Sequence, residues 1–238
     1  MTKMSRVFFP NTMPKDFRSL RRLRKSKPAG NSMATLQVIT ELPRLARRAA
    51  DSNKGDYGKV LVVAGSRGMS GAAVLSGNGA LRGGAGLVTV ATPESILPIV
   101  AAGNPCYLTA PLSQDEEGRI SDLAEARILE LAQKNDVAAI GPGLGQSPKI
   151  KLLLARLIPS LKIPWVLDAD GINALSGQTE ALKGHAGPII LTPHPGELAR
   201  LISCDVPTVR RLNKRRAWRP GRGGFGRACP SSFSGTPL

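Results

Sequence analysis

The sequence predicts an α/β fold, with a doubly wound, mostly parallel sheet that carries helices on both faces. Short apolar runs alternate with helical patterns between residues 59 and 202, as in a chain of βαβ units. The runs are apolar throughout, which is typical of strands covered on both faces. Several of them stop abruptly at small, polar or Pro/Gly residues, as strands do when their carboxyl ends form a binding cleft.

Each strand is predicted from an apolar run bounded by turn-forming residues. Right-handed crossovers between consecutive strands would wind the sheet in both directions. Pattern reasoning does not fix the strand order, which stays open. The predicted strands are 59–64, 86–91, 107–110, 136–140, 164–167 and 188–191.

Each helix is predicted from apolar residues at helical spacing. Glycines in the first helix suit close packing on a sheet. Pro93 and Pro195 mark helix starts, and Ser121 is the expected cap of the third helix. The predicted helices are 71–81, 94–101, 121–133, 148–158, 171–175 and 195–202.

The net charge of +16 lies at the two ends of the 238-residue chain. Residues 1–50 carry a net charge of +10 and residues 210–238 carry +8, whereas residues 51–209 carry −2. A basic protein suggests a nucleic-acid partner at first sight. Because the central part is slightly acidic, the basicity describes the ends and not the fold.

Residues 1–40 are expected to be a basic N-terminal extension that is disordered. Nine Lys or Arg and one acidic residue occupy 1–32, without periodic apolar patterning. Three readings stay open: an Arg-rich transit peptide, a nucleic-acid-binding arm, or sequence upstream of a true start at Met33. The missing periodicity favours the last.

Residues 210–238 are expected to be a basic, low-complexity tail. They contain seven Arg, five Gly and three Pro, but no Asp, Glu, Ile or Val. This composition is typical of a GC-rich reading frame read out of phase, so a frame disruption near 209–215 is the hypothesis. A natural disordered basic tail is the alternative. The folded domain is then expected over 41–209, incomplete at its C-terminal end.

The three cysteines, Cys106, Cys204 and Cys229, show no CxxC spacing. A disulfide framework or a zinc site is therefore not expected, and no residue is predicted as a metal ligand. Reduced thiols suit a cytoplasmic protein. No apolar run approaches 18 residues, so no membrane span is expected.

The segment 65–72 (GSRGMSGA) joins the first strand to the first helix. Free N–H groups at a helix start attract an anion or a polar ligand edge. Gly71 and Ala72 lack bulk, so a ligand could approach their backbone. The segment lacks the GxGxxG pattern, so no Rossmann dinucleotide site is predicted. A purely structural turn is the alternative.

The segment 141–145 (GPGLG) directly follows the predicted strand 136–140. Glycines on both sides of a proline make a rigid turn with accessible backbone. The N–H of Gly143 is therefore a candidate donor to a phosphate or an amide. A tight turn without a ligand is the alternative.

Polar side chains follow the predicted strand 164–167: Asp168, Asp170 and Asn173. Carboxylates at the carboxyl end of a strand suit magnesium or a substrate hydroxyl. Asp170 could equally cap the next helix through its side chain. Asp168 is therefore the better candidate for the site.

His194 lies between two prolines in the segment 192–197 (TPHPGE). Both prolines restrict the backbone, and Pro195 can begin the following helix. An imidazole held at a strand end is a good hydrogen-bonding group for a ligand. The other histidine, His185, lies in a polar loop and is read as solvated.

Taken together, these segments resemble the family of ADP/ATP-dependent NAD(P)H-hydrate dehydratases, which has a ribokinase-like fold. The resemblance covers 41–209 and is more specific than any single motif. Its matching segments are KGDYGKVLVVAGSRGMSGAAVL (54–75), ALRGGAGLVTVATPES (80–95), AIGPGLG (139–145), VLDADGINAL (166–175) and LTPHPGELARL (191–201).

The resemblance implies a hydro-lyase that repairs the S form of hydrated NADH or NADPH. Such enzymes use ADP or ATP, with Mg²⁺, to phosphorylate the added hydroxyl, and then eliminate phosphate. By position, Ala72, Gly143 and His194 match family residues that hold the hydrated cofactor. The resemblance also implies a homo-oligomer if the domain is intact, and a companion epimerase, for which a separate chain is one alternative.

The sequence departs from the family after residue 209. The family continues with a Lys-Gly-x-x-Thr segment for the nucleotide phosphates and a Gly-x-Gly-Asp turn whose Asp is the expected catalytic base. Neither segment occurs in the 238 residues. No catalytic residue is therefore assigned, and little or no turnover is expected of this chain.

Two other functions stay open. A small-molecule kinase for a vitamin precursor would have the same fold, although LTPHPGE and GPGLG favour the dehydratase. A nucleic-acid-binding protein would use its basic ends, but it needs aromatic or basic residues on an ordered surface. The ends show no recognisable module of this kind, so nucleic acid is not the favoured partner.

Overall fold

The computed structural model describes residues 47–217, and the side chains of residues 47–211. The predicted extension 1–40 and residues 218–238 of the predicted tail lie outside this range. Residues 49–206 form one compact unit. All six strands belong to the unit 49–206.

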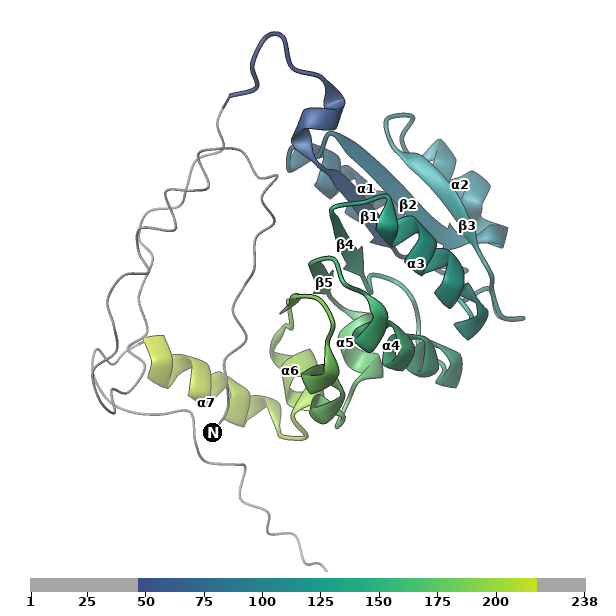
Figure 1. The fold of residues 1–238 in the computed structure, drawn as a ribbon. Helices are drawn as coiled ribbons and strands as arrows, with labels where there is room; N and C mark the ends of the chain where they lie inside the picture. The colour runs from purple at the N-terminus through teal and green to yellow at the C-terminus, as the bar shows by residue number, and fades with distance from the viewer. Residues whose placement is uncertain (1–46, 218–238) are drawn as a thin grey trace, which may run out of the picture. The chain divides into compact units, whose positions relative to one another are not determined.

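One sheet of six parallel strands forms the centre of this unit, in the order β3-β2-β1-β4-β5-β6 (Figure 1). All six strand predictions are confirmed, with ends that differ by a few residues. The chain runs outward from β1 to β3 and then outward again from β4 to β6. The strands are β1 (Lys59–Val63), β2 (Leu87–Pro93), β3 (Leu108–Leu112), β4 (Val137–Ile140), β5 (Trp165–Leu167) and β6 (Ile189–Leu191).

The six predicted helices are also present, and two of them begin with a 3₁₀ turn. Additional 3₁₀ turns are η2 (Lys54–Tyr57) and η5 (Thr179–Gly184). The helices are α1 (Ser70–Arg82), η3 and α2 (Glu94–Ile96 and Leu97–Ala102), η4 and α3 (Asp122–Ala124 and Glu125–Gln133), α4 (Pro148–Ser160), α5 (Asp170–Ala174) and α6 (Pro195–Leu201).

Ser121 stands at the predicted cap position, but its side chain makes no capping hydrogen bond. Its carbonyl accepts the N–H of Ala124 at 3.2 Å, because the helix begins with a 3₁₀ turn. The buried Ser121 hydroxyl has no hydrogen-bond partner among the described residues. The side-chain cap predicted at this position is therefore wrong.

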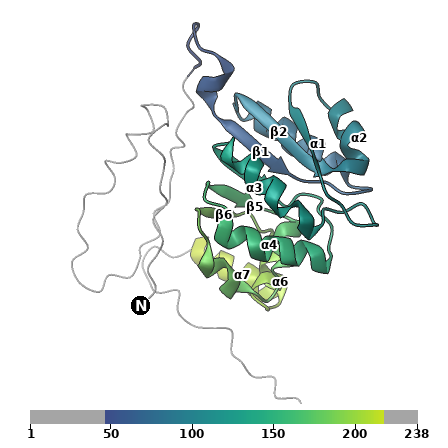
Figure 2. The ribbon, with the colours of Figure 1, turned by 45° about the vertical axis from the view of Figure 1, so that its right-hand side comes forward.

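Helices cover both faces of the sheet, as predicted (Figures 1 and 2). Leu61 and Val63 of β1 pack on the face covered by α3 and α4, whereas Val62 packs on the face covered by α1 and α2. The alternation follows from the two-residue period of a strand. A Cβ on Gly77 of α1 would lie 2.8 Å from Val90 Cγ2, so this glycine allows the close packing expected of α1.

Helix α7 (Val206–Ala217) crosses the predicted start of the tail at residue 210. Seven of the twelve residues in its sequence, VPTVRRLNKRRA, are Arg, Lys, Leu or Ala. These residue types have high helix propensity, and the charge of Arg and Lys does not prevent it. The first eight residues of the predicted tail are therefore helical. The division of the chain at residue 209 stays a prediction.

None of the helices described between residues 47 and 217 combines the length and the apolar character needed to cross a bilayer. Cys106 is a free, exposed thiol. The third cysteine, Cys229, lies outside the described residues.

Candidate functional site

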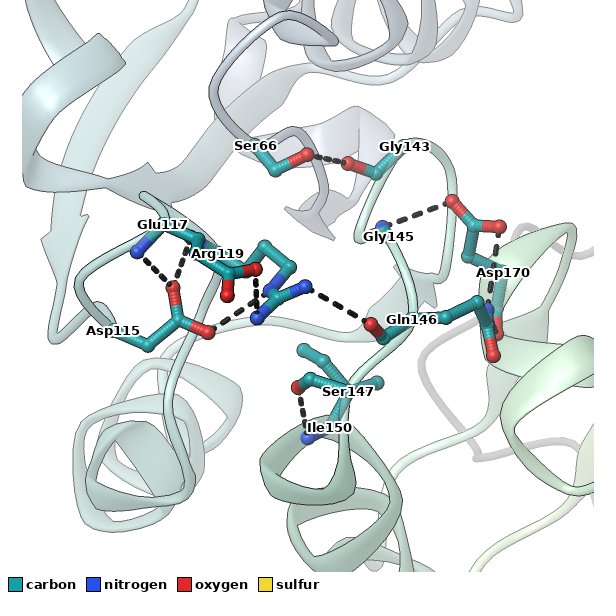
Figure 3. Close-up of polar contacts among 10 residues, drawn as sticks. All are labelled: Ser66, Asp115, Glu117, Arg119, Gly143, Gly145, Gln146, Ser147, Ile150 and Asp170. Carbon is teal, nitrogen blue, oxygen red and sulfur yellow. Dashed lines mark hydrogen bonds and ion pairs between the residues drawn. The ribbon is translucent and has the colours of Figure 1, made fainter.

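The candidate site lies at the carboxyl edge of the sheet, where β1 and β4 are neighbours. The chain reverses its direction of winding at this point, and such switch points form ligand crevices in open α/β sheets. The β1–α1 loop (64–69) and the β4–α4 loop (141–147) meet here. Ser66 Oγ donates to the Gly143 carbonyl at 2.8 Å, and the Gly65 N–H donates to the Pro142 carbonyl at 2.9 Å (Figure 3).

Ala72 and Gly143, two predicted site residues, lie in direct contact. A Cβ on Gly143 would be only 2.7 Å from Ala72 Cβ and 3.1 Å from the Met69 carbonyl oxygen. Gly143 also has φ of 65°, a left-handed conformation that side chains disfavour. Position 143 therefore has no room for a side chain, because the β1–α1 and β4–α4 loops pack directly against each other there.

The Gly143 N–H has no hydrogen-bond partner among residues 47–217. The Ala72 N–H, by contrast, donates to the Met69 carbonyl at 3.1 Å. Gly71 is exposed in the first turn of α1, and a Cβ there would meet nothing within 4 Å. Gly143 is itself buried, and its amide is thus a donor without a partner among the described residues, while Ala72 contributes a small apolar surface.

Asp168 and Asn173 already have side-chain partners. Asp168 Oδ1 accepts the Thr192 hydroxyl at 2.7 Å, and Asn173 Oδ1 accepts Arg200 Nε at 2.8 Å. These bonds join the segments that follow β5 and β6. Within residues 47–217, no group of three His, Cys, Asp or Glu side chains is placed to hold a metal ion, so no described residue is assigned to magnesium.

Asp170 does not cap α5, so that alternative is wrong. The N-cap residue is Ala169, which makes no capping bond. Asp170 Oδ2 instead accepts the Gly145 N–H at 2.9 Å, and the Gln146 amide donates to the Asp170 carbonyl at 3.0 Å (Figure 3). Ala169 itself has φ of 50°, an unfavourable conformation for alanine.

His194 is the N-cap residue of α6. Its Nδ1 accepts the N–H groups of Gly196 and Glu197, at 3.0 and 3.3 Å, and Glu197 Oε2 accepts the His194 N–H at 2.9 Å. Since Nδ1 is an acceptor, the neutral ring carries its proton on Nε2, which lies 3.1 Å from Glu197 Oε1. The side chain is 60% exposed. The hydrogen-bond and ion-pair partners of its ring among the described residues lie in the first turn of α6. The structure therefore brings together Ala72 and Gly143, but gives His194 no polar contact to either of them.

His185 differs from its prediction. It is half-buried, and its Nδ1 lies 2.8 Å from the Gly187 carbonyl oxygen. The reading of this ring as solvated is therefore wrong, because the loop folds back on itself within two residues.

Sequence reasoning missed two residues of the β3–α3 loop (113–121) that contact this site. Arg119 Nε donates to Asp115 Oδ2 at 2.9 Å, and an Arg119 guanidinium N–H donates to the Gln146 carbonyl at 3.1 Å (Figure 3). Arg119 also pairs with the exposed Glu117. The signal available in the sequence was the turn DEEGR (115–119), whose Gly118 has φ of 74°.

The Asp115 carboxyl is 7% exposed. Burial alone would raise its pKa, but hydrogen bonds from the Arg119 N–H and guanidinium, the Arg119 charge and the Glu117 N–H outweigh that effect. The pKa of Asp115 therefore lies below its ordinary value of 3.8. The carboxylate stays ionised beside Arg119 at neutral pH.

The parallel, doubly wound sheet places this unit among the open α/β folds, an architecture that several classes of protein share. A ribokinase-like superfamily protein from Enterococcus faecalis superposes with a TM-score of 0.58 at 24% identity, over 71% of this chain and 57% of that one. At this identity the match shows the fold. The predicted ribokinase-like fold is confirmed.

The chain belongs to the NAD(P)H-hydrate dehydratase family, whose family model matches residues 60–219. The ADP-dependent (S)-NAD(P)H-hydrate dehydratase of Bacillus subtilis is 36% identical over 173 residues, which cover 73% of this chain and 56% of that protein. A crystal structure of the ADP/ATP-dependent NAD(P)H-hydrate dehydratase from Bacillus subtilis, co-crystallized with ATP/Mg²⁺, superposes with a TM-score of 0.55 at 32% identity, over 73% of this chain and 57% of that one.

A longer relative is the bifunctional NAD(P)H-hydrate repair enzyme Nnr of Moorella thermoacetica, 45% identical over 167 residues. The match covers 70% of this chain and 32% of that enzyme. The chain thus spans about a third of the bifunctional relative and little more than half of the single-function one.

Proposed function

We propose that this chain binds the S form of hydrated NADH or NADPH in the crevice between the loops 64–69 and 141–147. It does so as part of an ADP- or ATP-dependent hydro-lyase that restores the reduced cofactor. The observation that carries the proposal is the unpartnered Gly143 N–H beside Ala72, at the switch point of the sheet. Membership of the dehydratase family supports the choice of ligand.

The residues present suit a flat, polar ligand edge. The Gly143 N–H would donate to a ligand acceptor, and the Ala72 methyl would pack against the ligand ring without blocking it. The exposed His194 ring is the third candidate contact. Each of these groups binds or orients the substrate, and none of them transfers a proton.

A nucleotide with Mg²⁺ would supply the phosphate that turns the hydroxyl into a leaving group. Mg²⁺ that accompanies a nucleotide is held largely by phosphates and waters, with one or two carboxylates. Between 47 and 217 no group of three acidic, Cys or His side chains is placed to hold a metal, so no described residue is assigned to this ion. The 238 residues also contain neither Lys-Gly-x-x-Thr nor Gly-x-Gly-Asp. We therefore expect binding of the hydrated cofactor by this chain without turnover.

Calorimetric titration of the 238-residue chain with purified S-form hydrated NADPH tests the proposal. Saturable binding that exceeds the binding of NADPH itself is the expected result, since the added hydroxyl distinguishes the two ligands. Equal or absent binding of both ligands would overturn the proposed substrate. ADP-dependent recovery of NADPH absorbance, measured in parallel, would contradict the expected lack of turnover.

We further propose a cytoplasmic homo-oligomer that depends on an epimerase from a separate chain to convert R-form substrate. Light scattering of the purified chain tests the oligomer, for which a monomeric mass is the contrary result. Calorimetric titration with R-form hydrated NADPH, with and without prior treatment by an epimerase, tests the dependence on that enzyme.

A further inference from the structure

We propose that Arg119 and Asp170 are positioning residues for the site, which together hold the loop 141–147 so that the Gly143 N–H faces the ligand. This inference rests on the proposed function, since it concerns the same crevice. Neither side chain needs to touch the substrate. Their role is to fix the backbone that does.

Hydrogen bonds fix the loop on its β1 side. The Gly141 N–H donates to the Val63 carbonyl at 3.2 Å, and the Leu144 N–H donates to the Gly141 carbonyl at 3.3 Å. The carbonyls of residues 142 and 143 accept the bonds from residues 65 and 66 described above. These contacts fix one side of the peptide that carries the Gly143 N–H.

Asp170 fixes the following residues from the β5 side. Its carboxylate accepts the Gly145 N–H at 2.9 Å, and its carbonyl accepts the Gln146 side-chain amide at 3.0 Å. The bond from the Gly145 N–H to this carboxylate is charge-assisted, and such hydrogen bonds are stronger than those between neutral groups. The strained Ala169 immediately precedes this residue, so the chain bends sharply to place Asp170 against the loop.

Arg119 fixes the end of the loop from the β3 side. Its guanidinium donates to the Gln146 carbonyl at 3.1 Å, and its Cδ packs 3.1 Å from the position of a Cβ on Gly145. Asp115 holds the guanidinium in place and also accepts two N–H groups of its own turn, from Glu117 at 3.0 Å and from Arg119 at 2.9 Å. The Arg119 side chain that contacts the loop is therefore itself held in place.

The consequence is a loop anchored at both ends around the peptide that carries the Gly143 N–H. In the backbone of 141–146, the N–H or the carbonyl of each residue is held by a hydrogen bond, yet the Gly143 N–H has no partner among the described residues. A donor that is already oriented costs less to engage than one on a mobile turn. Loss of either anchor is expected to let the loop relax and to weaken binding.

The test compares Arg119→Gln and Asp170→Asn with a matched control, Arg156→Gln. Arg156 pairs with Asp122 and Glu125 at 3.7 and 3.5 Å, and among the described residues its side chain makes no hydrogen bond to the loop 141–147. Two measurements are made on the full chain. The first is the ¹H–¹⁵N shift and the solvent exchange rate of the Gly143 amide without ligand, and the second is the affinity for S-form hydrated NADPH.

The expected result is a shifted, faster-exchanging Gly143 amide and roughly tenfold weaker binding in both loop variants, the scale of one misplaced hydrogen bond. The control is expected to change neither, and all three variants should keep a native spectrum elsewhere. An unchanged Gly143 amide in both loop variants would overturn the inference. So would an affinity loss that the control shares.

If the wild-type chain does not bind the hydrated cofactor, the proposed function fails. The amide measurement still decides the positioning of the loop in that case, because it requires no ligand. A shifted amide would keep Arg119 and Asp170 as loop anchors, and an unshifted amide would refute them.

Discussion

At the scale of single residues, backbone conformation limits the site more than side-chain chemistry does. The sequence predicted Gly143 as a donor from the GPGLG pattern, and the structure places its N–H at the switch point, beside Ala72. What the pattern could not show is how closely the Gly143 backbone packs against the β1–α1 segment. That depends on Ala72 and Met69, which lie about seventy residues earlier in the chain.

Gly143→Ala is expected to destabilise the protein by about 2 kcal/mol, because alanine combines a positive φ with a clash against Ala72. Binding of hydrated NADPH should be lost as well. Urea denaturation and calorimetry measure the two effects. The control is Gly79→Ala in α1, where a Cβ meets nothing within 4 Å and a stabilisation of about 0.5–1 kcal/mol is expected. Equal effects of the two substitutions would contradict this account of Gly143.

Ala169→Gly is expected to stabilise the protein by about 1 kcal/mol, because glycine tolerates φ of 50° where alanine does not. Ala101→Gly, on an exposed position of α2, is the control and should destabilise by about 0.5–1 kcal/mol. Denaturation midpoints measure both. A loss of stability in both variants would show that Ala169 is unstrained.

At the scale of elements, the strands and helices were predictable, but their spatial relations were not. Apolar runs mark β1 to β6 because buried parallel strands have no polar face. The order of the strands depends on pairing between distant segments, which no local pattern encodes. Asp170 illustrates the limit. Its neighbours in the sequence suggested a helix cap, whereas the N–H that its carboxylate accepts belongs to Gly145, 25 residues earlier.

Helix α6 offers a way to separate two roles of His194. His194→Ala removes the cap and should cost about 1 kcal/mol, whereas His194→Asn keeps a good capping side chain and should cost little. If the ring also binds ligand, both variants lose affinity for hydrated NADPH. Unfolding free energies and calorimetric affinities check the pair. Wild-type affinity in the Asn variant would show that His194 caps α6 but does not bind the ligand.

The β3–α3 loop predicts a pH dependence of stability. Because the pKa of Asp115 is lower in the folded protein than its ordinary value, the ionised form favours folding. This stabilisation is complete above the unfolded-state pKa and is lost as the pH falls through the folded-state pKa. Asp115→Asn should therefore flatten the fall in unfolding free energy between about pH 5 and about pH 3. Urea denaturation across this range measures it, with the exposed Glu116→Gln as the control that keeps the wild-type slope.

At the scale of the whole molecule, the net positive charge and the candidate site belong to different parts of the sequence. The candidate residues from Gly71 to His194 lie in the slightly acidic central region, and the basic residues are concentrated at the ends. The high net charge is therefore a poor guide to the function of the folded unit. The family match, over residues 60–219, covers most of the central region and runs ten residues into the basic C-terminal part.

A variant that lacks residues 1–46 is expected to bind hydrated NADPH as tightly as the full chain, since all candidate contacts lie beyond residue 64. Calorimetry at two salt concentrations makes the comparison. Steeply salt-dependent binding to a DNA or RNA probe, lost in this variant, would instead favour a nucleic-acid role for the N-terminal region. A drop in cofactor affinity would show that this region contributes to the site.

The strand order has a further consequence for the motions of the sheet. Strands β1 to β3 come from one continuous stretch of chain and strands β4 to β6 from another, so the pairing of β1 with β4 is the seam between two locally connected halves. A ligand held by Ala72 and Gly143 would touch both halves at once, and its occupancy would oppose their separation. Saturation with ligand should therefore slow hydrogen exchange along β1 and β4 more than along the outer strands β3 and β6.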